Sequence, residues 1–319
     1  MPAVSVVIPS LDGEKLLPVV LESLRLQTFQ DFDVVVVDNG SKDHSLELLK
    51  SRYPEVLVVA LQRNLGFAGA VNRGIKASAS EFVSVLNNDI ELDPRWLEEL
   101  HTTLIEHPEA GAAGPKMMMY FERNRINILG LRLNRTGEVE LIGAGEDDHG
   151  QYDQMRYVFG VSAGAALYRR KMFDEIGLFD EQFFANYEDA DLAFRAQLAG
   201  YKALYVPAAV AYHMVGSTIR RRKYLSTYLN NRNRIIFLWK NMQAETVEKY
   251  FLTIFRREAG LLLKRILLNF YKLRTFYYLK GTVSGLMHIP GVLQQRKKSK
   301  ALQRVSADYI ESIMDKDFV

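Results

Sequence analysis

The feature that most constrains the fold of this chain is the alternation of apolar runs and helical patterns over its first hundred residues. The apolar runs are short, continuous and rich in valine, which is typical of strands covered on both faces. Strands that alternate with helices favour a parallel, doubly wound sheet, because parallel neighbours need crossover connections. The predicted strands cover residues 4–10, 32–38, 56–61 and 82–89, and the helices between them include residues 14–27 and 67–78.

Polar side chains gather where these four strands end. The carboxyl ends of parallel strands meet at one edge of a sheet, and ligands of such sheets bind beyond that edge. We therefore expect a single site there, built from residues far apart in the chain. The residues at the four strand ends are Ser10, Asp38 with Asn39, Arg63 with Asn64, and Asn88 with Asp89.

The second and third strand ends suggest a bound nucleotide. Asp38 can accept a hydrogen bond from a nucleobase or a ribose, although the same turn can simply cap a helix. Gly66 and Gly69 permit close backbone approach, and the helix N-terminus there can face a phosphate beside Arg63, with plain packing of small residues as the alternative. No GxGxxG, no Walker lysine motif and no glycine-rich start after the first strand is present, which disfavours dinucleotide-binding, P-loop and nucleotidyltransferase enzymes.

The stretch VLNNDIELDP at residues 85–94 indicates a metal site at the fourth strand end. A carboxylate there, at Asp89, suits a hard divalent cation such as Mg²⁺ or Mn²⁺, which would bridge a diphosphate. Asn88 would position a phosphate or a sugar hydroxyl. The alternative is that these side chains cap the helix that Pro94 opens, but Asp93 already occupies the capping position.

After residue 110 the alternation breaks. Residues 126–143 indicate a hairpin with a turn near 134–137, and residues 162–170 indicate a strand of small residues. A helix follows over residues 187–200, ended by Gly200, and a last strand covers residues 201–213.

Two further candidates for chemistry lie in this second half. Glu188, Asp189 and Asp191 crowd the start of one helix, where acids suit the helix dipole. The functional alternative is a general base that removes a proton from an attacking hydroxyl. His213 ends the last strand, so it is predicted to return to the same edge as a metal ligand or phosphate contact, although a lone histidine is often structural.

Charge divides the chain into an acidic and a basic part. Residues 1–215 carry 20 Lys and Arg against 31 Asp and Glu, and residues 216–319 carry 21 against 7. Apolar residues of the basic part recur at helical spacing, which suits a helix lying in an anionic membrane interface. Packing on the rest of the protein and a homodimer contact are the alternatives. The stripe comprises Phe251, Phe255, Ala259, Leu262, Ile266, Phe270, Leu273 and Tyr277.

Composition adds three expectations about the setting of the protein. The chain has no cysteine, so it carries neither disulfides nor thiolate chemistry. We find no signal peptide and no apolar run long enough to span a membrane. These features are compatible with a cytoplasmic protein.

The motifs taken together resemble family 2 glycosyltransferases, most closely the bacterial rhamnosyltransferase-like members. The resemblance covers about residues 3–218 and rests on the order of the segments more than on any one of them. The segments are VSVVIPS, VVVVDNGSKD, NLGFAGAVNRG, LNNDIELDP, GAALYRR, YEDADLAFR and HMVGST.

This resemblance implies a GT-A fold, with a Rossmann-like, mixed and mainly parallel sheet flanked by helices. It implies inverting transfer of a sugar from a nucleotide-diphosphate donor, with Asp189 as base and Glu188 as the alternative. Asp89 and His213 would bind Mg²⁺ or Mn²⁺, although Asn87 replaces the first acid of the Asp-x-Asp metal motif. The implied donor-binding residues are Pro9, Ser10, Asp38, Asn39, Arg63, Asn64, Gly66, Asn72 and Asn88.

The resemblance also implies a division of the chain and a set of partners. Residues 1–218 would form the catalytic domain, with donor binding over about 1–110 and the acceptor side over about 111–218. Residues 219–319 would form a basic, amphipathic helical region that holds the enzyme on the inner face of the plasma membrane. The donor would be dTDP-rhamnose or a UDP-sugar, and the acceptor a glycan or lipid-linked glycan of cell-surface polysaccharide synthesis.

Two other classes of function remain open on sequence alone. A sugar-nucleotide binder without catalysis is suggested by Asn87, and a nucleic-acid-binding protein by the basic region. The second is disfavoured because no nucleic-acid module is recognisable.

Overall fold

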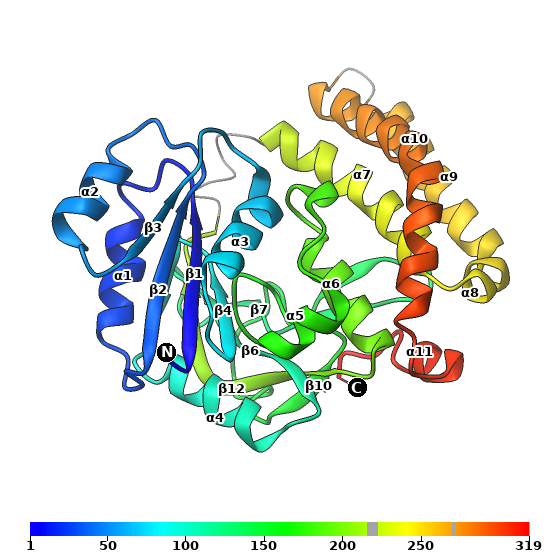
Figure 1. Cartoon of the computed structure of the whole chain (residues 1–319). Coiled ribbons are helices and arrows are strands. Elements are labelled where there is room, and N and C mark those ends of the chain that lie inside the picture. Colours follow the sequence, from blue (N-terminus) through cyan, green and yellow to red (C-terminus); the bar gives the residue numbers. More distant parts are fainter. Residues whose placement is uncertain (216–222, 270–271, 319) are drawn as a thin grey trace.

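The computed structural model describes residues 1–215, 223–269 and 272–318 and contains one large mixed sheet with helices on both faces (Figure 1). The strands follow the order β10-β12-β6-β11-β4-β1-β2-β3, with β5 paired to β12 and β7 paired to β6. A helical region follows β12 and lies beside the sheet (Figure 1). The α/β fold predicted from the sequence is therefore confirmed.

The first four strands form the predicted parallel half of the sheet. β1 pairs in parallel with both β2 and β4, and β2 with β3. The fourth strand ends earlier than expected, because residues 87–89 form a turn before the short strand β5, Ile90–Leu92. The elements are β1 Val4–Ser10, α1 Leu17–Arg25, β2 Phe32–Asp38, α2 Ser45–Arg52, β3 Leu57–Ala60, α3 Gly66–Ala77, β4 Phe82–Leu86 and α4 Trp96–Glu106.

Residues of β1 show why a continuous apolar run is needed here. Val6 and Ile8 belong to the apolar cluster that includes residues of α1 and α4, whereas Val7 belongs to the cluster that includes residues of α3. Successive side chains of a strand point to opposite faces, so a strand with helices on both faces presents apolar side chains on both, as Val6, Val7 and Ile8 do here.

The sequence did not predict β6, Ala110–Met119, which lies between β12 and β11 inside the sheet. Its small residues and proline resemble a loop, but they allow close packing. A Cβ at Gly111 would lie 2.6 Å from the Met172 sulfur, and one at Gly114 would lie 2.8 Å from Val161. The short strand β10, Arg156–Val158, was also missed.

The remaining strands of the second half were predicted. β11, Ala165–Arg169, is antiparallel to β4 and β6, and β12, Lys202–His213, is parallel to β6. The predicted hairpin forms in part, since β8 pairs with β9 while β7 joins β6. The other elements here are β7 Ile126–Ile128, β8 Leu131–Leu133, β9 Val139–Leu141, α5 Arg170–Ile176, the 3₁₀ helix η1 Glu181–Phe183 and α6 Glu188–Leu198.

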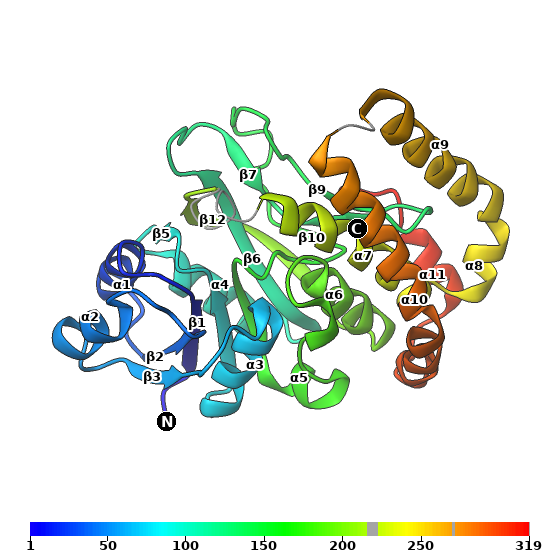
Figure 2. The ribbon, with the colours of Figure 1, turned by 90° about the horizontal axis from the view of Figure 1, so that it is seen from above.

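The helical region after β12 contacts the sheet-containing part of the chain both at its beginning and at its end. Its first helix, α7, contacts α6 and packs along α10, and the chain returns at α11 to the β8–β9 hairpin, where the Asp315 N–H donates to the Leu133 carbonyl. α9 lies on the outer side (Figure 2). The helices are α7 Lys223–Asn241, α8 Ala244–Lys249, α9 Phe251–Asn269, α10 Leu273–Ala301 and α11 Ala307–Ser312.

Two predictions concern this helical region: the single apolar stripe, and the domain boundary at residue 218. The apolar stripe is not one helix, because α9 ends at Asn269 and α10 begins at Leu273, and Phe270 lies outside the described residues. The predicted boundary at residue 218 and the segment 216–222 also lie outside them. Within the described ranges, no helix is long and apolar enough to cross a membrane.

Candidate active site

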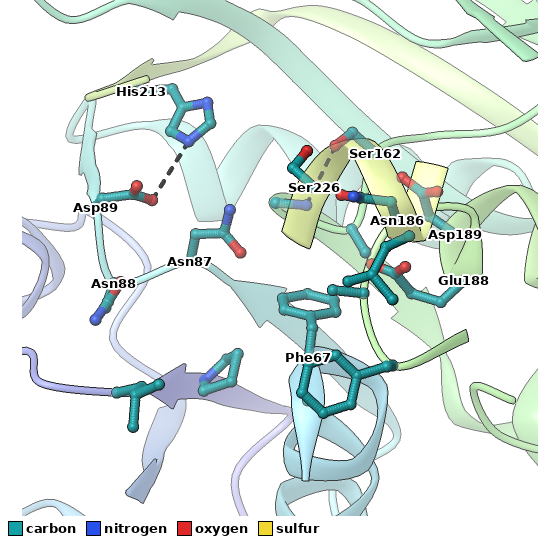
Figure 3. A pocket seen from close by; sticks show the side chains of 18 of the residues that line it. Phe67, Asn87, Asn88, Asp89, Ser162, Asn186, Glu188, Asp189, His213 and Ser226 are labelled. Atoms are coloured by element: carbon teal, nitrogen blue, oxygen red, sulfur yellow. Dashed lines mark hydrogen bonds and ion pairs between the residues drawn. The ribbon is translucent and has the colours of Figure 1, made fainter. Parts of the chain in front are cut away.

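A pocket of about 480 Å³ opens at the carboxyl ends of the strands, where the sequence predicted a single site (Figure 3). It gathers residues from the ends of β1, β2 and β12, the turn after β4, and the starts of α3, α6 and α7. Most of the predicted site residues line it. They are Pro9, Ser10, Asn39, Asn64, Gly66, Asn88, Asp89, Glu188, Asp189 and His213.

Three predicted residues do not line this pocket. Asn72 is buried, and its amide is fully used between α3 and the segment before η1: Nδ2 donates to the Phe179 carbonyl at 2.8 Å, and Oδ1 accepts from the Phe179 N–H at 3.1 Å. We therefore leave Asn72 out of the proposed donor-binding residues. Arg63 is exposed, with its backbone against Gly40. The third residue is Asp38.

Asp38 directly precedes the lining residue Asn39 and has an unused acceptor. Its Oδ2 accepts from the Ser41 N–H at 3.2 Å, so one oxygen serves the turn that the sequence suggested. Its Oδ1 is buried, and no residue in the described part of the chain donates to it. A buried acceptor without a partner is costly, so an imide N–H or a hydroxyl of a ligand would relieve it.

The turn before α3 is fixed by a network of two asparagines. Asn39 Nδ2 donates to Asn64 Oδ1 and to the Gly66 carbonyl, each at 3.0 Å. Asn64 Oδ1 also accepts from the Gly66 N–H at 2.8 Å, and Asn39 Oδ1 from the Leu65 N–H at 2.8 Å. Gly66 has φ +79°, and a Cβ there would lie 2.4 Å from the Phe184 carbonyl oxygen. These contacts fix the turn, and Gly66 and Phe67 at the start of α3 line the pocket.

The turn after β4 brings Asp89 against His213. Their Oδ1 and Nε2 atoms lie 3.3 Å apart, and His213 Nδ1 lies 2.9 Å from Asn127 Oδ1 (Figure 3). Carboxylate and imidazole are both metal-ligating groups, and this pair lines the pocket, so it could form one wall of a metal site.

The protein provides few further metal ligands. Among the described residues, no group of three or more Asp, Glu, His or Cys side chains is arranged to hold an ion. Asn87 stands where the resemblance places the first acid, and it also lines the pocket. A metal held here would therefore take most of its ligands from a diphosphate and water, which is common for Mg²⁺.

Glu188 and Asp189 face the pocket at the start of α6, across from Asp89 and His213 (Figure 3). Burial, and after it the charge of the neighbouring Asp189 carboxylate, raise the pKa of Glu188 to about 8. Burial also raises the pKa of Asp189, to about 6, against hydrogen bonds from the Ala190 and Ala163 N–H groups that favour its charged form. Two buried carboxylates side by side resist ionising together, so the pair is suited to taking up a proton near neutral pH.

Several lining residues were not predicted from the sequence. Ser162 and Asn186 adjoin predicted segments, so closer attention to those segments could have found them. Residues of α7 offered no such signal, because nothing in a helical, basic segment indicates a return to the sheet edge. These residues are Leu225, Ser226 and Leu229.

Comparison with known proteins identifies the family. The family model described as "Glycosyl transferase family 2" matches residues 5–177, more than half of the chain. The chain belongs to glycosyl transferase family 2. It is 31% identical over 226 residues to the N-acetylglucosaminyl-diphospho-decaprenol L-rhamnosyltransferase of Mycobacterium tuberculosis, covering 63% of this chain and 72% of that relative.

Other proteins similar to this glycosyltransferase are aligned over different fractions of their own length. Uncharacterized protein y4gI of Sinorhizobium fredii is 29% identical over 226 residues, but the match spans 66% of this chain and only 24% of that protein. The structure of Staphylococcus aureus TarS residues 1–349 aligns with a TM-score of 0.56 at 18% identity, covering 93% of this chain and 87% of that one.

A mannosyltransferase from Pyrobaculum calidifontis, solved with GDP-Man and Mn²⁺, aligns with a TM-score of 0.56 at 16% identity, covering 98% of this chain and 83% of that one. At such low identity these structures establish the fold alone. The GT-A fold predicted from the resemblance is thereby confirmed.

Proposed function

We propose that this glycosyltransferase inverts the anomeric centre as it moves a sugar from a nucleotide-diphosphate donor to a hydroxyl group. The observation that supports this most strongly is the position of an uncompensated carboxylate pair, Glu188 and Asp189, across one pocket from Asp89 and His213. The start of α3, which we propose lies near the diphosphate, adjoins the same pocket through Gly66 and Asn64. A single displacement needs a base on one side of the sugar and a leaving group on the other.

The proposed reaction proceeds in one step. Asp189 takes the proton of the acceptor hydroxyl as that oxygen attacks the anomeric carbon. The bond from this carbon to the diphosphate oxygen breaks, and the electron pair leaves with the nucleoside diphosphate. Glu188 keeps its proton and so avoids a second charge beside the base.

Asp89 and His213 are the residues that would hold Mg²⁺ or Mn²⁺. When bound, the ion would neutralise charge on the departing diphosphate. An imidazole ligand suits Mn²⁺ better than Mg²⁺, which prefers oxygen ligands. We therefore expect Mn²⁺ to support the higher activity, with EDTA lowering the rate.

For the donor we propose dTDP-rhamnose, with UDP-sugars as the second choice, because the relative named above is an L-rhamnosyltransferase. For the acceptor we propose a lipid-linked glycan, since the name of that relative includes N-acetylglucosamine linked through a diphosphate to decaprenol, a lipid. The apolar rim of the pocket is compatible with such an acceptor. It includes Leu141, Val215, Leu225 and Leu229.

Two measurements test this function. In the first, dTDP, UDP and GDP are each added with Mn²⁺, and the midpoint of thermal unfolding is followed; the favoured nucleotide should raise it through mass action. In the second, dTDP-rhamnose is incubated with a synthetic N-acetylglucosaminyl-diphospho-lipid, and the product linkage is determined by NMR.

The possible results separate the competing functions. A new glycosidic bond of inverted configuration supports the proposal, and transfer from a UDP-sugar alone corrects only the donor. Stabilisation by a nucleotide without any transfer or donor hydrolysis would indicate a binder without catalysis. No response to nucleotides, with salt-dependent binding of nucleic acid, would favour the nucleic-acid-binding alternative.

We further propose that the enzyme works as a peripheral protein on an anionic membrane, at the inner face of the plasma membrane. Large apolar side chains of α9 and α10 are exposed, including Phe255 at 60% and Phe276 at 58%, and Leu267 at 70%. Lys264 and Lys280 belong to the same two helices. Residues 216–319 together contain 21 Lys and Arg but only 7 Asp and Glu. Exposed apolar residues next to cations suit an interface that contains anionic lipid.

Flotation with vesicles of phosphatidylglycerol and phosphatidylcholine tests the membrane proposal. Phe255→Glu combined with Leu267→Glu should reduce the floated fraction several-fold. Phe121→Glu is the matched control, because Phe121 is 81% exposed but lies in the loop after β6. Equal flotation of all three proteins, or a shift from monomer to dimer in place of flotation, would contradict the membrane proposal.

A further inference from the structure

The segment that leads into the carboxylate pair has a backbone that needs external support. Phe184, Asn186 and Tyr187 have φ values of 65°, 69° and 73°, which place three of four successive non-glycine residues in the left-handed region. Such conformations are strained for residues with a side chain and persist where neighbouring groups hold them. Tyr187 directly precedes Glu188, so the support of this segment bears on the position of the pair.

One side chain of α7 contacts most of the segment. Asn233 is fully buried, and its Nδ2 lies 2.8 Å from the Phe183 carbonyl oxygen, 2.9 Å from that of Ala185 and 2.7 Å from that of Asn186. Three carbonyl groups of this segment thus converge on one amide. Asn233 therefore holds the strained backbone by its carbonyl groups.

Two neighbours on α7 extend this contact. Arg232 donates from Nη2 to the Gln182 carbonyl at 2.8 Å and to the Phe183 carbonyl at 3.0 Å, and its Nε donates to Asn233 Oδ1 at 2.8 Å. The Asn233 amide is thus oriented by its own neighbour. Farther along, the Phe237 ring packs against the Tyr187 ring with centroids 5.8 Å apart.

The same segment also touches the donor side of the pocket. The Phe184 carbonyl accepts from the Ala68 N–H in the first turn of α3 at 3.3 Å, and Gly66 leaves room for it. A shift of this segment would therefore move Glu188 and Asp189 relative to the helix N-terminus proposed to face the diphosphate.

We propose that Asn233 is a positioning residue for the Glu188–Asp189 pair, so that α7 is a working part of the active site. This inference rests on the proposed role of Asp189 as base. A base must lie within hydrogen-bond reach of the proton it takes, and a misplacement of about 1 Å can lower a rate on the order of 10²-fold.

The test compares Asn233→Ala with Asn231→Ala. Asn231 is a matched control on the same helix: it is also buried, but its Nδ2 donates to the Tyr278 carbonyl at 2.8 Å and to Thr282 Oγ1 at 2.5 Å, and so ties α7 to α10. Amide hydrogen exchange, read by mass spectrometry on peptides that cover residues 183–190, reports the segment directly and needs no substrate.

We expect Asn233→Ala to speed exchange in residues 183–190 by at least about tenfold and to lower kcat for transfer from dTDP-rhamnose by roughly 10–100-fold. The KM for the donor should stay within about threefold. Asn231→Ala should change neither the exchange of this segment nor kcat, although it removes the same kind of buried bond. If Asn233→Ala does not fold, Arg232→Met provides a milder loss of support for the same carbonyls.

The outcomes separate this inference from the proposed function. Normal exchange and normal kcat in Asn233→Ala would overturn the positioning role while leaving the function intact. Equal losses in the two variants would mean that Asn233 acts through stability alone, which also overturns it. Full activity of Asp189→Asn would instead remove the base on which the inference rests.

Discussion

Helix α6 places carboxylates of one sequence cluster in two opposite electrostatic settings. Asp191 is fully buried and compensated: Lys240 Nζ lies 2.7 Å from Oδ1, Arg195 Nε lies 3.0 Å from Oδ2, and Asn241 Nδ2 lies 2.8 Å from Oδ1. These partners lower its pKa to about 2 against the effect of burial. Glu188 and Asp189, three and two residues away, form no ion pair with a cation of the described chain, and burial raises the pKa of both.

The difference shows that compensation of the charge distinguishes a carboxylate with a structural role from one that can take part in catalysis. Burial is common to both settings, so burial alone does not decide the role. Asp191 has its charge neutralised and joins α6 to α7, whereas the pair keeps an unpaired oxygen, Oε2 of Glu188, and faces the pocket. Groups with pKa values moved toward neutrality in a cleft are candidates for proton transfer.

The largest effect expected from this comparison is on stability. Lys240→Met would leave Asp191 and Asp180 without the cation that lies 2.7 Å and 2.6 Å from them, and breaking a buried ion pair costs about 3–5 kcal/mol. Urea unfolding would measure the loss. Lys249→Met is the control, because Lys249 is exposed and its pair with Glu311 should contribute less than about 1 kcal/mol. Equal losses of unfolding free energy in the two variants would contradict the view that the buried ion pairs of Lys240 stabilise the fold more than the exposed pair of Lys249.

The pH dependence of stability should have opposite signs for the two settings. The lowered pKa of Asp191 adds stability that is complete above its unfolded value of 3.8 and is lost as pH falls toward 2. The raised pKa of Glu188 makes the fold less stable as pH rises from 4.5 to 8, because the folded protein resists losing that proton.

Urea midpoints between pH 3 and pH 8.5 test this sign. Glu188→Gln cannot ionise, so it should gain roughly 1–3 kcal/mol over the unmodified protein between pH 5 and pH 8. Parallel curves for the two proteins would show that Glu188 has an ordinary pKa.

The smallest effect expected is on the rate of Glu188→Gln. At neutral pH the glutamine replaces a protonated carboxyl of similar shape, so kcat should fall by less than about tenfold. The rise of kcat through about pH 6, which belongs to Asp189, should remain, and any change near pH 8 should disappear. A loss of the acidic limb would instead assign the base to Glu188.

The sequence predicted the first half of the fold well because local pattern and tertiary setting agree there. The central valine runs of β1 and β2 present apolar side chains to both faces of the sheet, as is typical of strands covered on both faces. β6 was missed because its glycines and proline are typical of a loop. The glycines are needed because side chains from distant segments pack closely on this strand, and the local sequence does not show those contacts. Propensity is overridden where close packing selects small residues.

The candidate site divides in the same way. Asn39, Asn64 and Asp89 could be predicted because strand ends of a parallel sheet converge by topology. Asn233 could not, because an asparagine in a basic helix gives no sign of the carbonyls that it contacts. Asn72 illustrates the converse: it lies in a motif near the pocket, but its side chain is hydrogen-bonded to the Phe179 backbone, which the sequence does not indicate.

The most direct test of the account is the rate of transfer in Asp189→Asn, measured with donor and acceptor saturating, together with the dissociation constant of the donor. The account predicts a fall in kcat of at least about 10²-fold, while the donor dissociation constant stays within about threefold. A variant that transfers at nearly the unmodified rate would contradict the assignment of the base. A variant that loses donor binding as much as turnover would contradict the separation of the pocket into a donor wall and a base wall.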